Sequence, residues 1–373
     1  MNKKEVLEIR KQFTPANCAI TRMCGCYVDH EKVKQFESKD AFLSLPEEET
    51  FKYFDIFRKS LSGSIGKNLL SMPFPLESEK EGGTQEFLLR LRNSKLKNDA
   101  LLEEFYDKVI ENYAYNENYY IILIHAMYDI PGKASDGMEM YDASDEVYEF
   151  ILCSICPVSL SKAGLSYKSE ENRITDRIRD WIVDKPDKAF LFPAFTDRST
   201  DLHEIMYYTK KPTDLQELFI EEVLGTKKPL SAAEQKDAFN LLIQDTLGND
   251  GNYEIVRNIH EQVHELIEEH KEDLNVLQLD KAEIKKIFEK SNAPADKMES
   301  FDKTYDMAIG NQTSLMASNI TAERKFEIAT PSVKINVDPD RTDLIETKEI
   351  NGRKCLVIPV DETVEINGLT VKA

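Results

Sequence analysis

Four apolar segments that follow one another between residues 119 and 209 constrain the fold more than any other feature of the sequence. They read YYIILIHAMYDI, VYEFILCSICPVSL, KAFLFPAF and EIMYYT, and they are rich in the β-branched and aromatic residues that favour strands. Polar turns separate them, and one helix is predicted around Ile174 to Val183. Because strands joined by short links pair with their neighbours, the segments predict an antiparallel sheet rather than a parallel one.

Helical spacing of apolar residues dominates on both sides of these strands. Residues 17–28 are an exception and indicate one further strand near the start of the chain. The residues Phe51, Phe54 and Phe57 recur at helical spacing and predict a helix that buries an aromatic stripe. The expected helices cover 47–61, 85–113 with a break near Asn93 or Asn98, 213–224, 231–247, 253–272, 280–290 and 295–308.

From Pro331 onward the sequence returns to strand-like alternation. Asn351-Gly352 and Asn367-Gly368 each lie between apolar alternations, which predicts two tight hairpins because both turn residues must adopt positive φ. The predicted fold class is therefore α+β, with an N-terminal mixed part that contains the antiparallel sheet, a helical middle and a small C-terminal β-hairpin unit. The predicted domains are residues 1–225, 226–330 and 331–373, in keeping with a length of 373 residues.

The composition of the chain predicts the cellular compartment in which the protein is found. The chain is acidic, with a formal net charge of -20, and 41% of its residues are hydrophobic, which is typical of a folded, water-soluble protein. Charged residues near the start exclude the apolar core of a signal peptide, and the longest apolar runs are far shorter than a membrane span. We therefore expect a cytoplasmic protein without a membrane partner, whose six cysteines are reduced thiols.

Positive charge is concentrated near the N-terminus. Residues 1–98 hold 17 Lys and Arg against 14 Asp and Glu, whereas the remainder holds 31 against 54. A polyanion would therefore meet least repulsion in the first part of the chain. The candidate nucleic-acid-binding residues are Arg90, Arg92, Lys95 and Lys97, with Lys67 nearby in sequence, and the alternative is an ordinary solvated helix face.

One motif resembles a catalytic metal site. His260 and His264 stand one helical turn apart with Glu261 between them, as in zinc proteases, where the glutamate activates a zinc-bound water. His270 has the spacing of a third ligand, but Ile267 stands where the chain needs a glycine to leave the helix. The flanking glutamates indicate a solvated helix face, so the sequence favours no metal at this position.

The remaining motifs do not assemble an active site. Cys24, Cys26, Cys153 and Cys156 could supply four thiolates, but both pairs lie on predicted strands rather than on the turns that hold zinc. The segment GSIGKN after the first helix resembles only a fragment of a phosphate-binding loop. No catalytic residue can be assigned and no cofactor is implied, so a binding protein is favoured over an enzyme.

Several sequence blocks resemble a bacterial family known only as a domain of unknown function, and together they cover essentially the whole chain. The blocks are ITRMCGCYVD, AFLSLPEEETFKYF, SGSIGKNLL, YYTKKP, FIEEVLG and VDPDRTDLIETKEINGRKCLVIPVDETVEINGLTV. This resemblance implies no activity. The order of elements over residues 119–373, with FIEEVLG and AAEQKDAF in similar places, is similar to nucleoid-associated proteins of the NdpA/YejK type, although the basic cluster lies outside that region.

These observations lead to three hypotheses. The first is a cytoplasmic binding protein that associates with the nucleoid, through DNA or a DNA-associated protein partner. The second is a zinc-dependent hydrolase that uses His260, Glu261 and His264. The third is a protein interaction module without a ligand of its own, and a homo-oligomer is compatible with each.

Overall fold

The computed structural model describes residues 1–133, 139–140, 146–248, 251–311, 313–321, 326–360, 363–366 and 369–372. It divides into two compact units. Unit 1 comprises Met1–Ser231 with Leu274–Val276, and unit 2 comprises Ala232–Asp273 with Leu277–Ala373. The division of the chain into residues 1–225, 226–330 and 331–373 stays a prediction.

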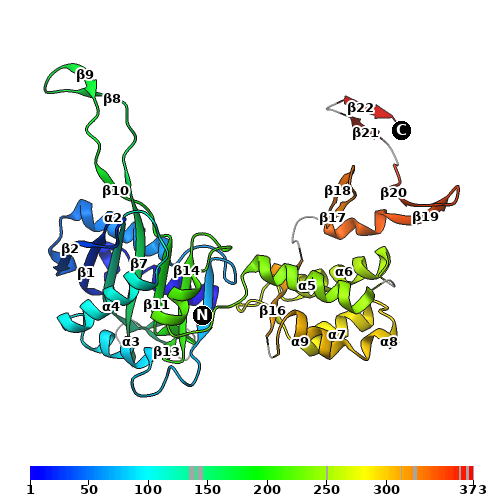
Figure 1. The fold of residues 1–373 in the computed structure, drawn as a ribbon, viewed down its shortest axis with the longest axis horizontal. Helices are drawn as coiled ribbons and strands as arrows, with labels where there is room; N and C mark the ends of the chain where they lie inside the picture. Colours follow the sequence, from blue (N-terminus) through cyan, green and yellow to red (C-terminus); the bar gives the residue numbers. More distant parts are fainter. Residues whose placement is uncertain are drawn as a thin grey trace. The chain divides into compact units, whose positions relative to one another are not determined.

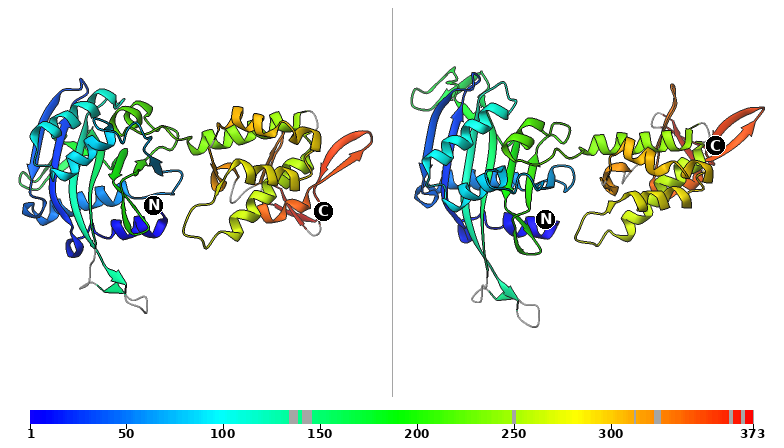
Figure 2. Two further views of the ribbon diagram at one scale, coloured as in Figure 1. Left: turned by 90° about the horizontal axis from the view of Figure 1, so that it is seen from below. Right: turned by 60° about the horizontal axis from the view of Figure 1, so that its bottom comes forward.

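Unit 1 is built on the antiparallel sheet that the sequence predicted. The strand order is β2-β1-β4-β7-β11-β14-β3, every neighbouring pair is antiparallel, and β10 also pairs with β7. Figures 1 and 2 show this sheet with β1 and β2 at one edge. The strands are β1 (Ile20–Val28), β2 (Lys34–Asp40), β3 (Leu69–Pro73), β4 (Tyr119–Ile130), β7 (Glu146–Leu160), β10 (Trp181–Val183), β11 (Lys188–Phe192) and β14 (Glu204–Thr209).

Helices cover both faces of this sheet because its strands are apolar on both faces. The first face packs against α1 (Lys3–Arg10) and α2 (Glu47–Ser60), and the second packs against α3 (Thr84–Asn93), α4 (Asp99–Asn112) and the π-helical turn η3 (Phe219–Val223). Cys153 faces the α3 and α4 side and Cys156 faces the α1 and α2 side, as the three-residue offset on a strand requires. Both thiols are buried.

Several local predictions are confirmed. The helix expected over 85–113 is broken where Asn98 caps α4 and accepts hydrogen bonds from the backbone N–H groups of Ala100 and Leu101. The turn Asn351-Gly352 has φ values of 52° and 73° and joins β19 (Glu346–Ile350) to β20 (Arg353–Val357). The strands β21 (Thr363–Ile366) and β22 (Leu369–Lys372) also pair, but Asn367-Gly368 lies outside the described residues.

Two helix predictions are wrong, and a third is right in its extent but not in its buried face. The segment Ile174–Val183 contains no helix, because its β-branched residues pair in strands β9 (Arg173–Asp176) and β10. The helix expected over 213–224 is shorter in the structure, where only a turn around η3 is helical. Gln216 adopts a φ of 57°, which a right-handed helix excludes. In α2, Phe54 and Phe57 are fully buried, but Phe51 is 44% exposed, so the aromatic stripe is only partly covered.

Unit 2 is a cluster of helices followed by small hairpins. The helices pack around an apolar core that includes Phe239, Phe288 and Phe301, whose rings contact one another edge to face. No helix within the described ranges of the chain is long and apolar enough to cross a bilayer. The helices are α5 (Ala232–Leu247), α6 (Tyr253–Glu269), α7 (Lys281–Lys290), α8 (Ala295–Met298), α9 (Phe301–Ala308) and α10 (Ala317–Ile320), and the hairpin β17 (Phe326–Ala329) and β18 (Lys334–Val337) precedes η5 (Pro339–Leu344).

Candidate functional site

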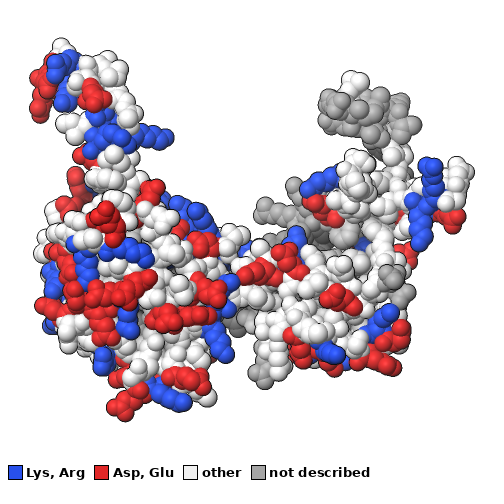
Figure 3. Space-filling view, viewed as in Figure 1, with Lys and Arg blue, Asp and Glu red and all other residues white. Residues whose placement is uncertain are grey.

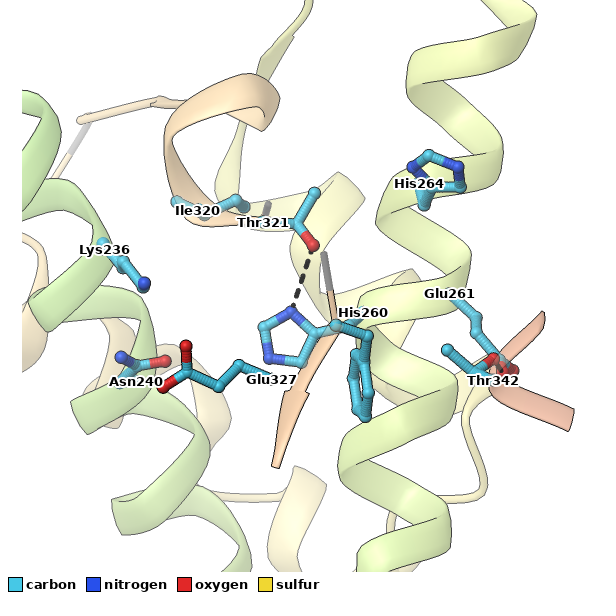
Figure 4. Close-up of a pocket in the computed structure, with 10 residues that line it drawn as sticks. Lys236, Asn240, His260, Glu261, His264, Ile320, Thr321, Glu327 and Thr342 are labelled. Atoms are coloured by element: carbon cyan, nitrogen blue, oxygen red, sulfur yellow. Dashed lines mark hydrogen bonds between the residues drawn. The ribbon is translucent and has the colours of Figure 1, made fainter. Parts of the chain in front are cut away.

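A pocket of about 470 Å³ lies in unit 2 between α5 and α6. Its remaining walls come from the end of α10, from β17 and from η5 (Figure 4). The volume is within the range of pockets that bind small molecules. The lining residues are Lys236, Asn240, His260, Glu261, His264, Ile320, Thr321, Phe326, Glu327 and Thr342.

The helix α6 places the histidine motif beside this pocket. The helix starts at Asn252, whose side chain accepts a hydrogen bond from the backbone N–H of Ile255 at 2.9 Å. Its buried stripe is Ile255, Ile259 and Val263. His260 follows Ile259 at the border of that stripe, so its ring is held by the core on one side and meets the pocket on the other.

His260 is a neutral, oriented imidazole. Its Nδ1 lies 3.3 Å from the hydroxyl oxygen of Thr321, and its ring packs between Phe239 and Phe326 with centroids 5.9 and 6.1 Å away. Burial lowers the pKa of His260 to about 4, and the positive charge of Lys236 acts in the same direction. Figure 4 shows the other ring nitrogen facing the cavity.

Glu261 does not join the two histidines at a common point. Its carboxylate accepts a hydrogen bond from the Thr342 hydroxyl and lies 3.3 Å from Nε of Arg257. Figure 4 shows it pointing away from His260, because successive residues of a helix project about 100° apart. His270 caps the helix, with Nδ1 2.8 Å from the carbonyl oxygen of Leu266.

These positions give the zinc hypothesis no geometric support. Across the described ranges, no group of three or more His, Cys, Asp and Glu side chains is placed to hold a metal ion. The motif spacing alone suggested a site, but an unbroken helix turns its third candidate ligand away.

The candidate nucleic-acid-binding residues lie in two separate places. Arg92 and Lys95 stand at the C-terminal end of α3, where Nζ of Lys95 is 4.0 Å from a carboxylate oxygen of Glu149. Arg90 and Lys97 are exposed in the same region. Lys67 precedes β3. The first residue of that strand, Leu69, is level through β14 and β11 with Ser154 of β7, roughly 17 Å along the strands from Glu149.

The structure adds a polar group that sequence reasoning missed. His125 is fully buried on β4, with Nδ1 2.6 Å from the Thr21 hydroxyl and Nε2 2.8 Å from Glu149. Burial lowers the pKa of His125 more than the adjacent carboxylate raises it. These residues come from three strands that only the sheet register brings together, and the sole sequence signal was a histidine inside the apolar run YYIILIHAMYDI.

A second feature missed by sequence reasoning is a β-ribbon that extends from β7 and β10. Residues 162–183, called the β-arm below, contain β8 (Leu165–Lys168) paired with β9 (Arg173–Asp176). Figure 1 shows this ribbon standing away from the rest of unit 1. Its exposed apolar side chains are Leu165, Tyr167, Ile174, Ile178, Trp181, Ile182 and Val183, with exposed fractions between 42% and 77%.

Comparison with protein families gives a match to a domain of unknown function, DUF4317, over residues 1–369. The chain belongs to this family. The match confirms the whole-chain resemblance seen in the sequence blocks. No curated protein matches the chain, so the similarity to nucleoid-associated proteins stays a prediction.

Membership of the DUF4317 family brings no activity with it, because the family description states none. The function must therefore be inferred from the β-arm, the pocket and the cationic end of α3.

Proposed function

We propose that this DUF4317 protein is a binding protein that acts through its β-arm, and that the partner bound there is a second copy of the chain. The observation that supports this proposal is an unusual concentration of exposed apolar side chains on a two-stranded ribbon. This proposal develops the interaction-module hypothesis and the expectation of a homo-oligomer. The cytoplasmic location remains part of the proposal.

The ribbon presents two different faces near its tip. Directly opposite residues of an antiparallel pair share a face, so Tyr167 and Ile174 lie together and Lys168 and Arg173 lie on the other side. The cations of the second face are matched within the ribbon, since Arg173 lies 2.6 Å and Lys168 3.9 Å from Glu171. The apolar face therefore has the chemistry of a protein contact, whereas the matched cations offer little to a nucleic acid.

The available area is close to that of a small dimer interface. Taking roughly 200 Å² for an aromatic and roughly 100 Å² for an aliphatic side chain, the exposed fractions of the seven apolar residues give at most roughly 550 Å² for each arm. This figure is an upper limit because consecutive strand residues such as Trp181 and Ile182 point to opposite faces. Two arms would therefore bury at most roughly 1,100 Å² of apolar surface, compared with the approximate 1,000 Å² expected of a specific interface.

Charge also favours contact at the arm. The whole chain carries a net charge of -20, so most approaches of a second copy are repelled. The β-arm holds five Lys and Arg and four Asp and Glu, so two arms meet with almost no net repulsion. Figure 3 shows both signs side by side on this ribbon, which allows opposite charges to face each other across a two-fold axis.

The test uses sedimentation velocity and the emission of Trp181, the single tryptophan of the chain. Trp181 is 57% exposed, so burial in a dimer is expected to shift its emission to shorter wavelength as protein concentration rises. The double substitution Tyr167→Ser with Ile174→Ser should give a monomer whose emission no longer shifts. The control Leu76→Ser removes a side chain that is 74% exposed outside the arm and should leave the dimer intact.

Two outcomes would contradict the proposal. One is a monomer at every concentration with unchanged Trp181 emission. The other is a dimer that the double substitution leaves as stable as the wild type, because that dimer would use a different surface.

Nucleic-acid binding is a second candidate, favoured by the exposed cations at the end of α3. Arg90 and Lys97 form no ion pair with any side chain in the described ranges, so both are free to meet phosphates. Arg92 and Lys95 share the negative charge of Glu149, which reduces their contribution. This arrangement supports DNA as a partner near α3 without requiring the β-arm.

The test is the fluorescence anisotropy of a labelled duplex DNA titrated with protein across a salt series. Binding should weaken steeply with salt, and Arg90→Ala with Lys97→Ala should reduce the slope of log K against log salt by about 2. Lys67→Ala removes one positive charge just before the edge strand β3, away from the end of α3, and serves as the control. Absence of binding at low salt, or binding that salt does not change, would reject this candidate.

A further inference from the structure

We propose that the pocket between α5 and α6 binds a small organic anion, with a carboxylate or phosphate group carried on an apolar body. This site belongs to unit 2 and is independent of the function proposed for the β-arm. The inference rests on the balance of charges around the cavity, on the donors that face it and on its apolar wall.

The negative charges of the described residues that line the pocket are already matched. Glu327 lies 2.7 Å from Nζ of Lys334, and Glu261 is held by Arg257 and Thr342. Lys236, by contrast, forms no hydrogen bond or ion pair within the described part of the chain. Among the described lining residues, Lys236 therefore supplies an unmatched positive charge, which favours an anionic ligand.

Neutral donors accompany that charge. Asn240 follows Lys236 by one helical turn, and Figure 4 shows both side chains projecting from α5 toward the cavity and facing His260 on α6. With the Thr321 hydroxyl as the donor to Nδ1 of His260, the ring proton is on Nε2, which faces the cavity. An ammonium, an amide and an imidazole N–H are together suited to the oxygens of a carboxylate or phosphate.

The rest of the pocket suits an apolar ligand body. The Phe326 ring contributes apolar surface beside the donors, and the fully buried Ile320 packs behind the pocket wall. A volume of about 470 Å³ exceeds what an inorganic ion needs and matches a small organic molecule. An aromatic acid or an aromatic phosphate ester has both the anionic group that the donors require and the apolar body that the wall requires.

The experiment titrates the full chain with benzoate and with phenyl phosphate, and uses benzamide as the uncharged analogue. Calorimetry measures affinity, and the imidazole NMR signal of His260, assigned with a His260→Phe variant, reports whether binding occurs at this pocket. We expect at least one of the two anions to bind saturably and to move the His260 signal, while benzamide leaves it in place. Which anion binds more tightly distinguishes a carboxylate ligand from a phosphate ligand.

Variants test the role of the unmatched charge. Lys236→Met should weaken binding about tenfold or more, because a charge-assisted hydrogen bond is lost. Lys286→Met removes an exposed lysine of α7 in the same unit and should leave affinity unchanged. The proposal is overturned if neither anion moves the His260 signal, if benzamide binds equally well, or if Lys236→Met binds as tightly as the wild type. None of these results depends on the oligomeric state.

Discussion

Acidification is expected to destabilise unit 2 through His260. The imidazole packs between Phe239 and Phe326, and Lys236 and Glu327 are the charged groups that line the pocket from the facing elements. The environment lowers the pKa of His260 from 6.5 to about 4, so the folded state resists protonation. An unfolded chain takes up this proton near its ordinary pKa, and the folded state therefore loses stability as pH falls from above 6.5 toward 4.

The size of the effect follows from this difference in pKa. For a folded pKa of about 4 and an unfolded value of 6.5, proton linkage removes at most about 2 kcal/mol of unfolding free energy between about pH 8 and pH 5. The figure is an upper bound because one edge of the ring meets solvent in the pocket.

Two measurements test the reasoning. An NMR titration of the imidazole C–H signals should show His260 titrating well below pH 6, while His203 titrates above its ordinary value because Glu79 lies 2.7 Å from its ring. Urea unfolding followed by circular dichroism at high and low pH should show a smaller loss of stability in His260→Phe than in the wild type. A His260 signal that titrates near 6.5 would refute the argument, and so would equal losses in both proteins.

Three further predictions concern single positions. Gly25→Ala should destabilise unit 1 by about 1–3 kcal/mol in chemical unfolding, because a Cβ there would lie 1.9 Å from the Tyr120 hydroxyl oxygen; a neutral result would mean that Tyr120 moves freely. Lys188→Met should cost about 3–5 kcal/mol, since the Asp187 carboxylate loses a fully buried ammonium at 2.6 Å and, among the described residues, keeps only the Tyr113 hydroxyl as donor. Adding Asp187→Asn should recover part of that loss. Metal analysis and a melting curve with a chelator should show no stoichiometric zinc and an unchanged Tm, and bound zinc would reopen the hydrolase hypothesis.

Much of the site could not be predicted because its residues meet only after folding. The spacing of His260 and His264 was visible in the sequence, but the separation of Glu261 from them depends on Arg257 and Thr342, which hold its carboxylate elsewhere. The contact of His125 with Thr21 and Glu149 depends on the register of three strands. Similarly, Lys67 belongs to the same cation-richer part of the sequence as Arg90, but the pairing of β3 with β14 places it at a different level of the sheet from Glu149, which Lys95 contacts after α3.

Short sequence signals were enough to predict the strands, helix caps and turns that depend on neighbouring residues alone. The apolar segments from 119 to 209 predicted four strands of the sheet, Asn98 marked the break between α3 and α4, and Asn351-Gly352 marked a hairpin. Each depends on the conformational preference of a few consecutive residues. Only the tertiary structure decided that Ile174–Val183 is a strand ribbon with an exposed apolar face, and that Lys236 and His260 share one pocket. Those arrangements depend on pairing and packing between segments distant in the chain, which no local preference encodes.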